Sequence, residues 1–113
     1  LKVAPLGGMK RSLELAAHHK LPIVVSSALE SVVGISHGLR LASALPNLEY
    51  ASGLATGALF ESDLGTIPIS NGVMSVSAPD IDDERLQRFV VSPERLEWWR
   101  NRISEVWKLR RAA

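Results

Sequence analysis

Hydrophobic and polar positions follow a helical period in two stretches of the first half of the chain. Over residues 9–20, the apolar side chains of Leu13, Ala16 and Ala17 recur every three or four positions, which predicts a helix with a polar outer face. The same period over residues 31–44 predicts a second helix. Two glycines inside the second stretch lower its helix propensity, so we expect them to allow close packing on a neighbouring element.

Short apolar segments separate these predicted helices. Residues 22–26 are rich in β-branched side chains, which is typical of a parallel strand covered on both faces. Residues 1–4 and 49–51 are predicted as two further strands, and residues 54–61 as a short helix. The alternation of strand and helix over residues 1–62 predicts an α/β fold with a parallel sheet. A (β/α)₈ barrel fits such short units best, with a doubly wound sheet as the second choice. Three units cannot close a barrel of eight strands, so we expect a partial barrel.

The pattern changes after residue 62. Asn71-Gly72 lies between two short apolar runs, which predicts a hairpin. The acidic residues 80–84 predict the start of a short helix, because carboxylates favour a helix N-terminus. Ser92 followed by Pro93 predicts the beginning of a last helix. Its apolar positions are Leu96, Trp99, Ile103, Val106 and Trp107. We therefore divide the chain into residues 1–62 and a tail of residues 63–113.

Composition narrows the classes of protein. The chain has 113 residues, which is room for one small domain. It has no Cys, which excludes disulfides, Cys-based zinc sites and thiol catalysis. A net charge of +1 gives no general attraction to nucleic acid or to an anionic membrane, and the apolar runs are too short to span one. Since the chain begins at Leu1 inside a predicted strand, we expect it to be the rear part of a longer cytoplasmic protein.

The candidate functional residues lie where the three predicted strands of the first half end. Lys2 ends the first strand, Ser26 and Ser27 end the second, and Gly53 follows the third. In a (β/α) barrel these ends meet at one mouth, where an ammonium, two hydroxyls and an unobstructed backbone would face a carboxylate ligand. Each residue taken alone is equally typical of an ordinary loop, so the prediction depends on their equivalent positions.

The remaining chemistry-bearing side chains give no site. His18 and His19 are adjacent and cannot share a helix face, and His37 is distant in sequence, so we expect no metal ligands among them. Trp99 and Trp107 lie at helical spacing, which favours packing against a neighbouring domain over stacking on bases.

Several stretches resemble the o-succinylbenzoate synthase family of the enolase superfamily. They are LKVAPLGG at residues 1–8, VVSSALES at 24–31, LASALP at 41–46 and YASGLATG at 50–57. The resemblance continues more loosely through Pro68 to Val73 and the helix bearing Trp98 and Trp99. It implies that residues 1–62 are the last three β/α units of a barrel, and that residues 63–113 pack toward a capping domain absent from this chain.

The resemblance also implies the chemistry. The family dehydrates a 2-succinyl-6-hydroxycyclohexadiene carboxylate to o-succinylbenzoate in menaquinone biosynthesis, and uses Mg²⁺ and a lysine base on earlier strands. Lys2 matches a second lysine that stabilises the anion, Ser26 and Ser27 match contacts to the succinyl carboxylate, and Gly53 matches the pocket floor. The metal ligands and the base would precede residue 1. We therefore expect the isolated chain to be inactive without the N-terminal half as partner.

Two alternatives stay open at this stage. A fragment of an N-succinylamino acid racemase would use Lys2 to exchange a proton with its substrate. A non-enzymatic interaction module would instead bind a partner protein through the Trp-bearing terminal helix. Replacement of the family's Cys by Ser52 and of its Gly by Ala55 leaves the choice between the two enzymes undecided.

Overall fold

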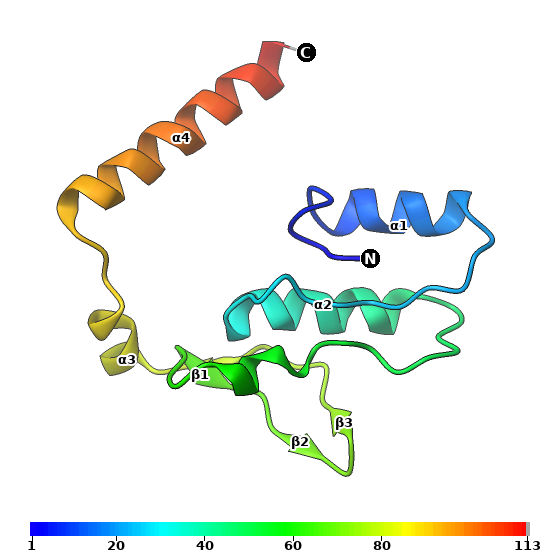
Figure 1. The fold of residues 1–113 in the computed structure, drawn as a ribbon. Coiled ribbons are helices and arrows are strands. Elements are labelled where there is room, and N and C mark those ends of the chain that lie inside the picture. The colour runs from blue at the N-terminus through cyan, green and yellow to red at the C-terminus, as the bar shows by residue number, and fades with distance from the viewer. Residues whose placement is uncertain (113) are drawn as a thin grey trace.

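The two helices of the first half form where the apolar period predicts them. The computed structural model describes residues 1–112, and in it α1 spans Met9–His18 and α2 spans Val32–Ala44. The two helices lie alongside each other (Figure 1). Their inner faces share one hydrophobic core with the segments before and between them. The core comprises Val3, Val25, Ile35, Leu39, Leu41, Leu45 and Leu54.

Regular strands do not form over the three segments predicted as strands in residues 1–62. Residues 1–4, 22–26 and 49–51 lie outside every named strand, and one parallel bridge joins Ser26 to Gly53. The strand predicted over residues 49–51 is therefore placed too early in the chain, because the residue that pairs with Ser26 is Gly53. The mixed helix-and-strand class is confirmed, whereas three regular β/α units are not seen in the described part of the chain.

The glycines of α2 allow the close packing that the sequence predicts. A Cβ atom on Gly38 would lie 2.6 Å from the Leu54 Cδ2 atom, so the helix backbone approaches this core side chain directly. Leu54 immediately precedes η1, a 3₁₀ helix over Ala55–Leu59. This element lies within residues 54–61, where the sequence predicts a short helix. The contact with Gly38 anchors η1 to α2.

Two small antiparallel pairs of strands follow residues 1–62, which we call the body. β2 (Ile69–Ser70) pairs with β3 (Val73–Met74) as the predicted hairpin. Asn71 has φ 50° and Gly72 has φ 76°, the left-handed conformations that a two-residue hairpin turn requires. β1 (Gly65–Thr66) pairs with β4 (Asp80–Ile81).

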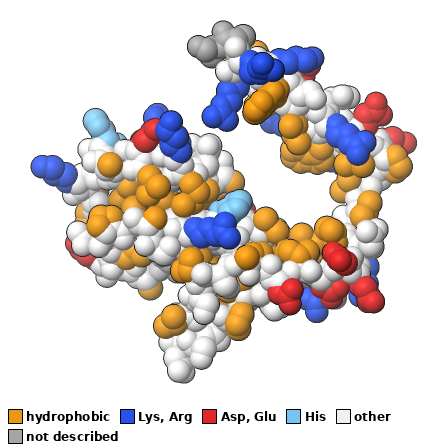
Figure 2. Space-filling view, turned by 180° about the vertical axis from the view of Figure 1, so that it is seen from behind, with side chains coloured by type: hydrophobic (Ala, Val, Ile, Leu, Met, Phe, Trp, Pro, Cys, Tyr) orange, Lys and Arg blue, Asp and Glu red, His pale blue; other side chains and the backbone are white. Residues whose placement is uncertain are grey.

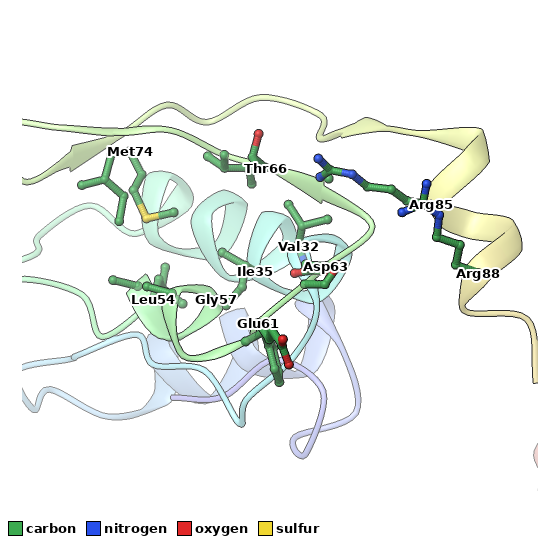
Figure 3. A pocket seen from close by; sticks show the side chains of 17 residues that line it. Val32, Ile35, Leu54, Gly57, Glu61, Asp63, Thr66, Met74, Arg85 and Arg88 are labelled. Carbon is green, nitrogen blue, oxygen red and sulfur yellow. The ribbon is translucent and has the colours of Figure 1, made fainter.

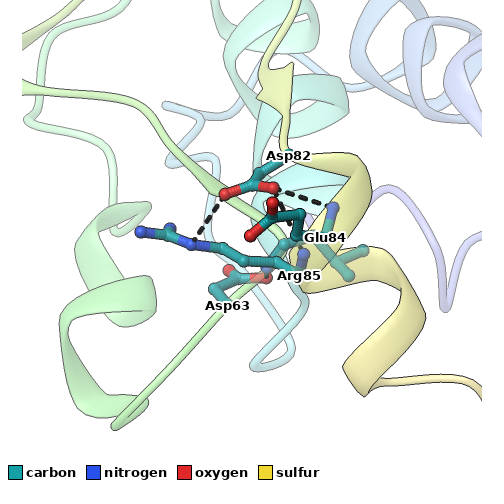
Figure 4. A network of polar contacts seen from close by, with 5 residues as sticks. Asp63, Asp82, Glu84 and Arg85 are labelled. Atoms are coloured by element: carbon teal, nitrogen blue, oxygen red, sulfur yellow. Dashed lines mark hydrogen bonds and ion pairs between the residues drawn. The ribbon is translucent and has the colours of Figure 1, made fainter.

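The helix predicted to start within residues 80–84 does so at Asp83. Asp80 and Ile81 belong to β4, and α3 spans Asp83–Arg88. The Asp82 side chain caps this helix by accepting hydrogen bonds from the backbone N–H groups of its second and third residues (Figure 4). The cap, and not the acidic run as a whole, therefore fixes where the helix begins.

The last helix, α4 (Pro93–Ala112), projects away from the rest of the chain (Figures 1 and 2). Its predicted cap is confirmed, since the Arg95 N–H donates to the Ser92 hydroxyl at 3.3 Å. Every side chain described on this helix is exposed, including those of its three tryptophans. The radius of gyration is 16.1 Å, against about 13 Å for a compact domain of this length. No described helix is both long and apolar enough to cross a bilayer.

Candidate functional site

The first segment of the chain lies beside the segment that follows α1. The Leu1 nitrogen donates to the Val24 carbonyl at 2.5 Å, and the Ser26 N–H donates to the Leu1 carbonyl at 2.9 Å. Two bonds from one residue to positions two apart on its neighbour are the pattern of parallel strands. They place Leu1 opposite Val25, and therefore Lys2 opposite Ser26.

The segment around Gly53 lies on the other side of the middle segment in the same way. The Gly53 N–H donates to the Val25 carbonyl at 2.8 Å, and the Ser27 N–H donates to the Gly53 carbonyl at 3.0 Å. This is the parallel bridge between Ser26 and Gly53. The segments of Lys2, Ser26 and Gly53 thus lie in that spatial order, as the sequence predicts for the ends of three parallel strands.

This register puts Lys2, Ser26 and Gly53 in one row, which we call the open face. Ser26 Cβ lies 3.4 Å from the position that a Cβ atom on Gly53 would occupy, so these two residues share a face. Lys2 and Gly53 are exposed and Ser26 is half-buried. Because side chains alternate along an extended chain, the neighbouring positions point to the helices instead. Of those positions, Val3, Val25, Ser27 and Leu54 are buried, and Leu1 and Ser52 are half-buried.

The ammonium group of Lys2 is the one charge on the open face. Its Nζ donates a hydrogen bond to the carbonyl oxygen of Ser27. The ion pairs found within residues 1–112 do not involve Lys2. An ammonium has three donors, so two remain for a ligand. With the Ser26 hydroxyl in the same row, the open face is suited to an anionic oxygen, such as that of a carboxylate.

The two adjacent serines do not act as a pair of hydroxyls. The Ser27 side chain points to the helix side, is 6% exposed, and its Oγ lies 2.5 Å from the Thr56 Oγ1. The expectation that both hydroxyls line one site overlooked the alternation of side chains along an extended segment. Thr56 was missed because its contact spans 29 residues and leaves no local pattern in the sequence.

The residues of the open face do not form a metal site. An ammonium repels cations, and Mg²⁺ takes oxygen ligands, chiefly carboxylates and water. Among the described residues, no group of three His, Cys, Asp or Glu side chains is arranged to hold a metal ion. His18 and His19 are exposed and stack edge to face with ring centroids 5.0 Å apart, and His37 is exposed on α2. The donor set present in this chain therefore does not fit the metal that the family resemblance implies.

A separate pocket of about 460 Å³ lies on the helix side (Figure 3). Val32 and Ile35 of α2 and Leu54 form part of its apolar wall, and Arg85 and Arg88 of α3 stand at one end. Lys2, Ser26, Ser27 and Gly53 are not among its lining residues. The predicted site residues and this pocket thus belong to different faces of the molecule.

Comparison with known proteins identifies relatives over nearly the whole chain. The o-succinylbenzoate synthase of Mycobacterium tuberculosis (strain ATCC 25618 / H37Rv) is 46% identical over 96% of this chain and 34% of its own length. The proteins of the same name from Mycobacterium leprae (strain TN) and Mycobacterium ulcerans (strain Agy99) are 47% and 44% identical, again over 96% of this chain. No protein-family profile matches the chain.

The chain spans about one third of the length of these relatives. A relationship at this identity over 96% of the chain is far beyond what a shared fold alone produces. The resemblance to o-succinylbenzoate synthase that the sequence motifs carry is therefore confirmed, for a chain corresponding to about a third of such a protein.

Proposed function

We propose that this chain is the C-terminal part of an o-succinylbenzoate synthase and supplies one wall of its active site. The observation that carries the proposal is the row formed by Lys2, Ser26 and Gly53 on the open face. Three segments separated in sequence by whole helices bring an ammonium, a hydroxyl and a bare backbone to neighbouring positions. This parallel pairing is not expected if Lys2 were only a surface lysine and Ser26 and Gly53 only loop residues.

In this reading the three segments are the last three barrel strands, and the open face is the interior wall. Barrel strands point alternate residues inward and outward, as the buried and exposed positions of these segments do. The positions facing the helices are apolar, apart from Ser27 and Ser52. The active-site end of a (β/α) barrel is the carboxyl end of its strands, where Lys2, Ser26 and Gly53 lie.

Each residue of the row has a distinct task in the dehydration. The base takes the proton beside the substrate carboxylate, which places negative charge on the carboxylate oxygens until the ring hydroxyl leaves as hydroxide and takes up a proton to form water. The Lys2 ammonium stabilises that charge, most strongly in a site from which water is excluded. The Ser26 hydroxyl donates to the carboxylate of the succinyl chain. Gly53 leaves space for the substrate beside Ser26, because it has no side chain on the open face.

The base that removes the proton is not provided by the open face. Lys2 is its one titratable side chain, and we assign it to stabilising charge. We infer that the base and the carboxylates for the family's metal come from the remaining two thirds of the assembled enzyme. The 113-residue chain alone is then inactive, and its open face becomes an enclosed wall only in the assembly.

A chimera tests this function. The third of the Mycobacterium tuberculosis protein that matches this chain is replaced by it, joined where the two sequences begin to match. The chimera dehydrates the substrate of the synthase, followed as o-succinylbenzoate by chromatography. Lys2→Ala in the chimera lowers kcat about 10²- to 10³-fold, the typical effect of removing a stabiliser of an oxyanion.

The matched control is Lys10→Ala, because the Lys10 side chain is 91% exposed on α1 and its ion pair, with Glu14, lies on the same helix. It leaves the activity unchanged. A chimera that folds but forms no product, or one in which Lys2→Ala and Lys10→Ala behave alike, contradicts the proposed function. Lys2-dependent exchange of the substrate's α-proton without dehydration indicates the racemase instead.

A further inference from the structure

Ser27 joins the three segments of the candidate site through three different groups. Its N–H donates to the Gly53 carbonyl at 3.0 Å, and its carbonyl accepts from the Lys2 Nζ. Its hydroxyl is bonded to the Thr56 hydroxyl, with 2.5 Å between the two oxygens. The main chain at Ser27 is thus held from both sides, and its carbonyl receives the ammonium of Lys2.

The hydroxyl pair is partly buried. Ser27 is 6% exposed, and Thr56 is half-buried at the second position of η1. Removing either hydroxyl leaves the other without its partner in a site that water hardly reaches, which is unfavourable. The Thr56 end is itself fixed, since Leu54 before η1 packs directly against Gly38 of α2. The pair therefore connects Ser27 to the helical core.

A lysine ammonium needs such a fixed acceptor if it is to be oriented. Its four-carbon stem is flexible, so charge alone does not determine where the nitrogen lies. A hydrogen bond from a charged donor to a carbonyl is stronger than one between neutral groups. The Ser27 carbonyl occupies one of the three ammonium donors and leaves two directed elsewhere.

We propose that Thr56 is a positioning residue for Lys2: its hydroxyl holds Ser27, and the Ser27 carbonyl then orients the ammonium on the open face. This inference deepens the proposed function and rests on it for its catalytic meaning. The role of Ser27 is accordingly one of alignment, and its hydroxyl does not contact the substrate.

The first test measures the reactivity of Lys2 in the 113-residue chain itself. The chain is treated with a limiting amount of acetic anhydride, and acetylation of Lys2 is compared with that of Lys10 by mass spectrometry of the same sample. Lys10 is an internal standard, because its side chain is 91% exposed. Thr56→Val removes the hydroxyl at nearly constant volume and raises the Lys2 to Lys10 ratio about threefold, as expected when one hydrogen bond is loosened.

Thr56→Ser is the conservative control and retains the wild-type ratio, because the hydroxyl is kept. Ser27→Ala removes the same pair from the other side without adding a methyl group, and raises the ratio as Thr56→Val does. Helical circular dichroism checks that each variant is folded. An unchanged ratio in whichever of Thr56→Val and Ser27→Ala is folded overturns the proposal, as does an equal rise in Thr56→Ser.

The second test uses the active chimera. Thr56→Val lowers kcat about 10- to 100-fold with little change in KM, because a misplaced ammonium loses interactions made in the transition state. Thr56→Ser restores kcat. A loss of kcat that Thr56→Ser does not restore contradicts the positioning role. If the chimera is inactive while the labelling ratios change as stated, the proposed function fails and the alignment of Lys2 by Thr56 stands.

Discussion

The carboxylate of Asp63 accepts a hydrogen bond of 2.7 Å from the backbone N–H of Val32, the first residue of α2. Its second oxygen accepts from the N–H of Leu64, also at 2.7 Å. A helix leaves its first N–H groups without partners in the helix, and Asp63 satisfies one of them from 31 residues away. The carboxylate thereby fixes the start of the tail to the first half of the chain (Figures 3 and 4).

Asp63→Ala is expected to lower the free energy of unfolding by about 1–2 kcal/mol, because it removes this cap and leaves two backbone donors unsatisfied. Urea denaturation followed by helical circular dichroism measures the change. Ser31→Ala is the matched control. Ser31 occupies the N-cap position of α2, but its hydroxyl makes no capping bond. A larger loss in Ser31→Ala than in Asp63→Ala would contradict the assignment.

Gly38 is expected to tolerate replacement poorly, because α2 packs closely against Leu54 at this position. Gly38→Ala places a methyl group 2.6 Å from the Leu54 Cδ2 atom and forces the two elements apart. We expect a loss of about 1–3 kcal/mol in the free energy of unfolding, as for overpacked cores. Gly57→Ala is the control, because a Cβ atom there meets nothing within 4 Å. Equal urea midpoints for the two variants would rule out the close contact.

The pKa of Lys108 is raised above its ordinary value of 10.5, first by its hydrogen bond to Glu105 and then by the charge of that carboxylate. Their atoms lie 2.8 Å apart on α4. A group whose pKa is raised in the folded state stabilises that state below its unfolded pKa, and this contribution is lost as the pH rises through the folded pKa. We therefore expect the helicity of α4 to fall slightly above pH 10.5.

Glu105→Gln should return the pKa of Lys108 toward the ordinary value, which an NMR titration of the lysine side chain measures. The same variant should remove the Lys108 part of the fall in helicity. A pKa that is unaltered by Glu105→Gln would show that another group raises it.

The fluorescence of the three tryptophans is expected to depend on the surroundings of α4 and not on the folding of the rest of the chain. Trp98, Trp99 and Trp107 are each at least 44% exposed, and the described side chains of this helix are all exposed. Their fluorescence should resemble that of indole in water and should hardly change when urea unfolds the body. Removal of residues 93–113 should leave the urea midpoint of the remainder unaltered. A blue-shifted emission, or a large loss of stability in the shortened chain, would show that α4 packs against the body.

Local signals in the sequence predict the helices and the hairpin well. The ranges of α1, α2 and α4 follow from apolar periodicity and from the Ser92 cap, and Asn71-Gly72 predicts its turn. The strands are predicted poorly, because parallel pairing depends on partners distant in sequence. The same reason explains β4, in which Asp80 pairs with Thr66 instead of opening a helix.

The candidate site is predicted in part. The sequence places Lys2, Ser26 and Gly53 at equivalent segment ends, and the structure brings them into one row. It does not distinguish the two serines, whose side chains lie on opposite faces. Nor does it indicate Thr56, whose partner is fixed only once the chain has folded.

The row on the open face has two outer margins. The Lys2 segment borders one margin and the Gly53 segment the other, while the middle segment bonds to both. Each outer segment therefore has a second flank that bonds to neither of the other two segments, although the Lys2 carbonyl there already accepts from the Leu6 N–H. A companion polypeptide that adds a strand on a single flank leaves the other in contact with water. Only one that returns to both flanks encircles the ammonium and shields it from solvent.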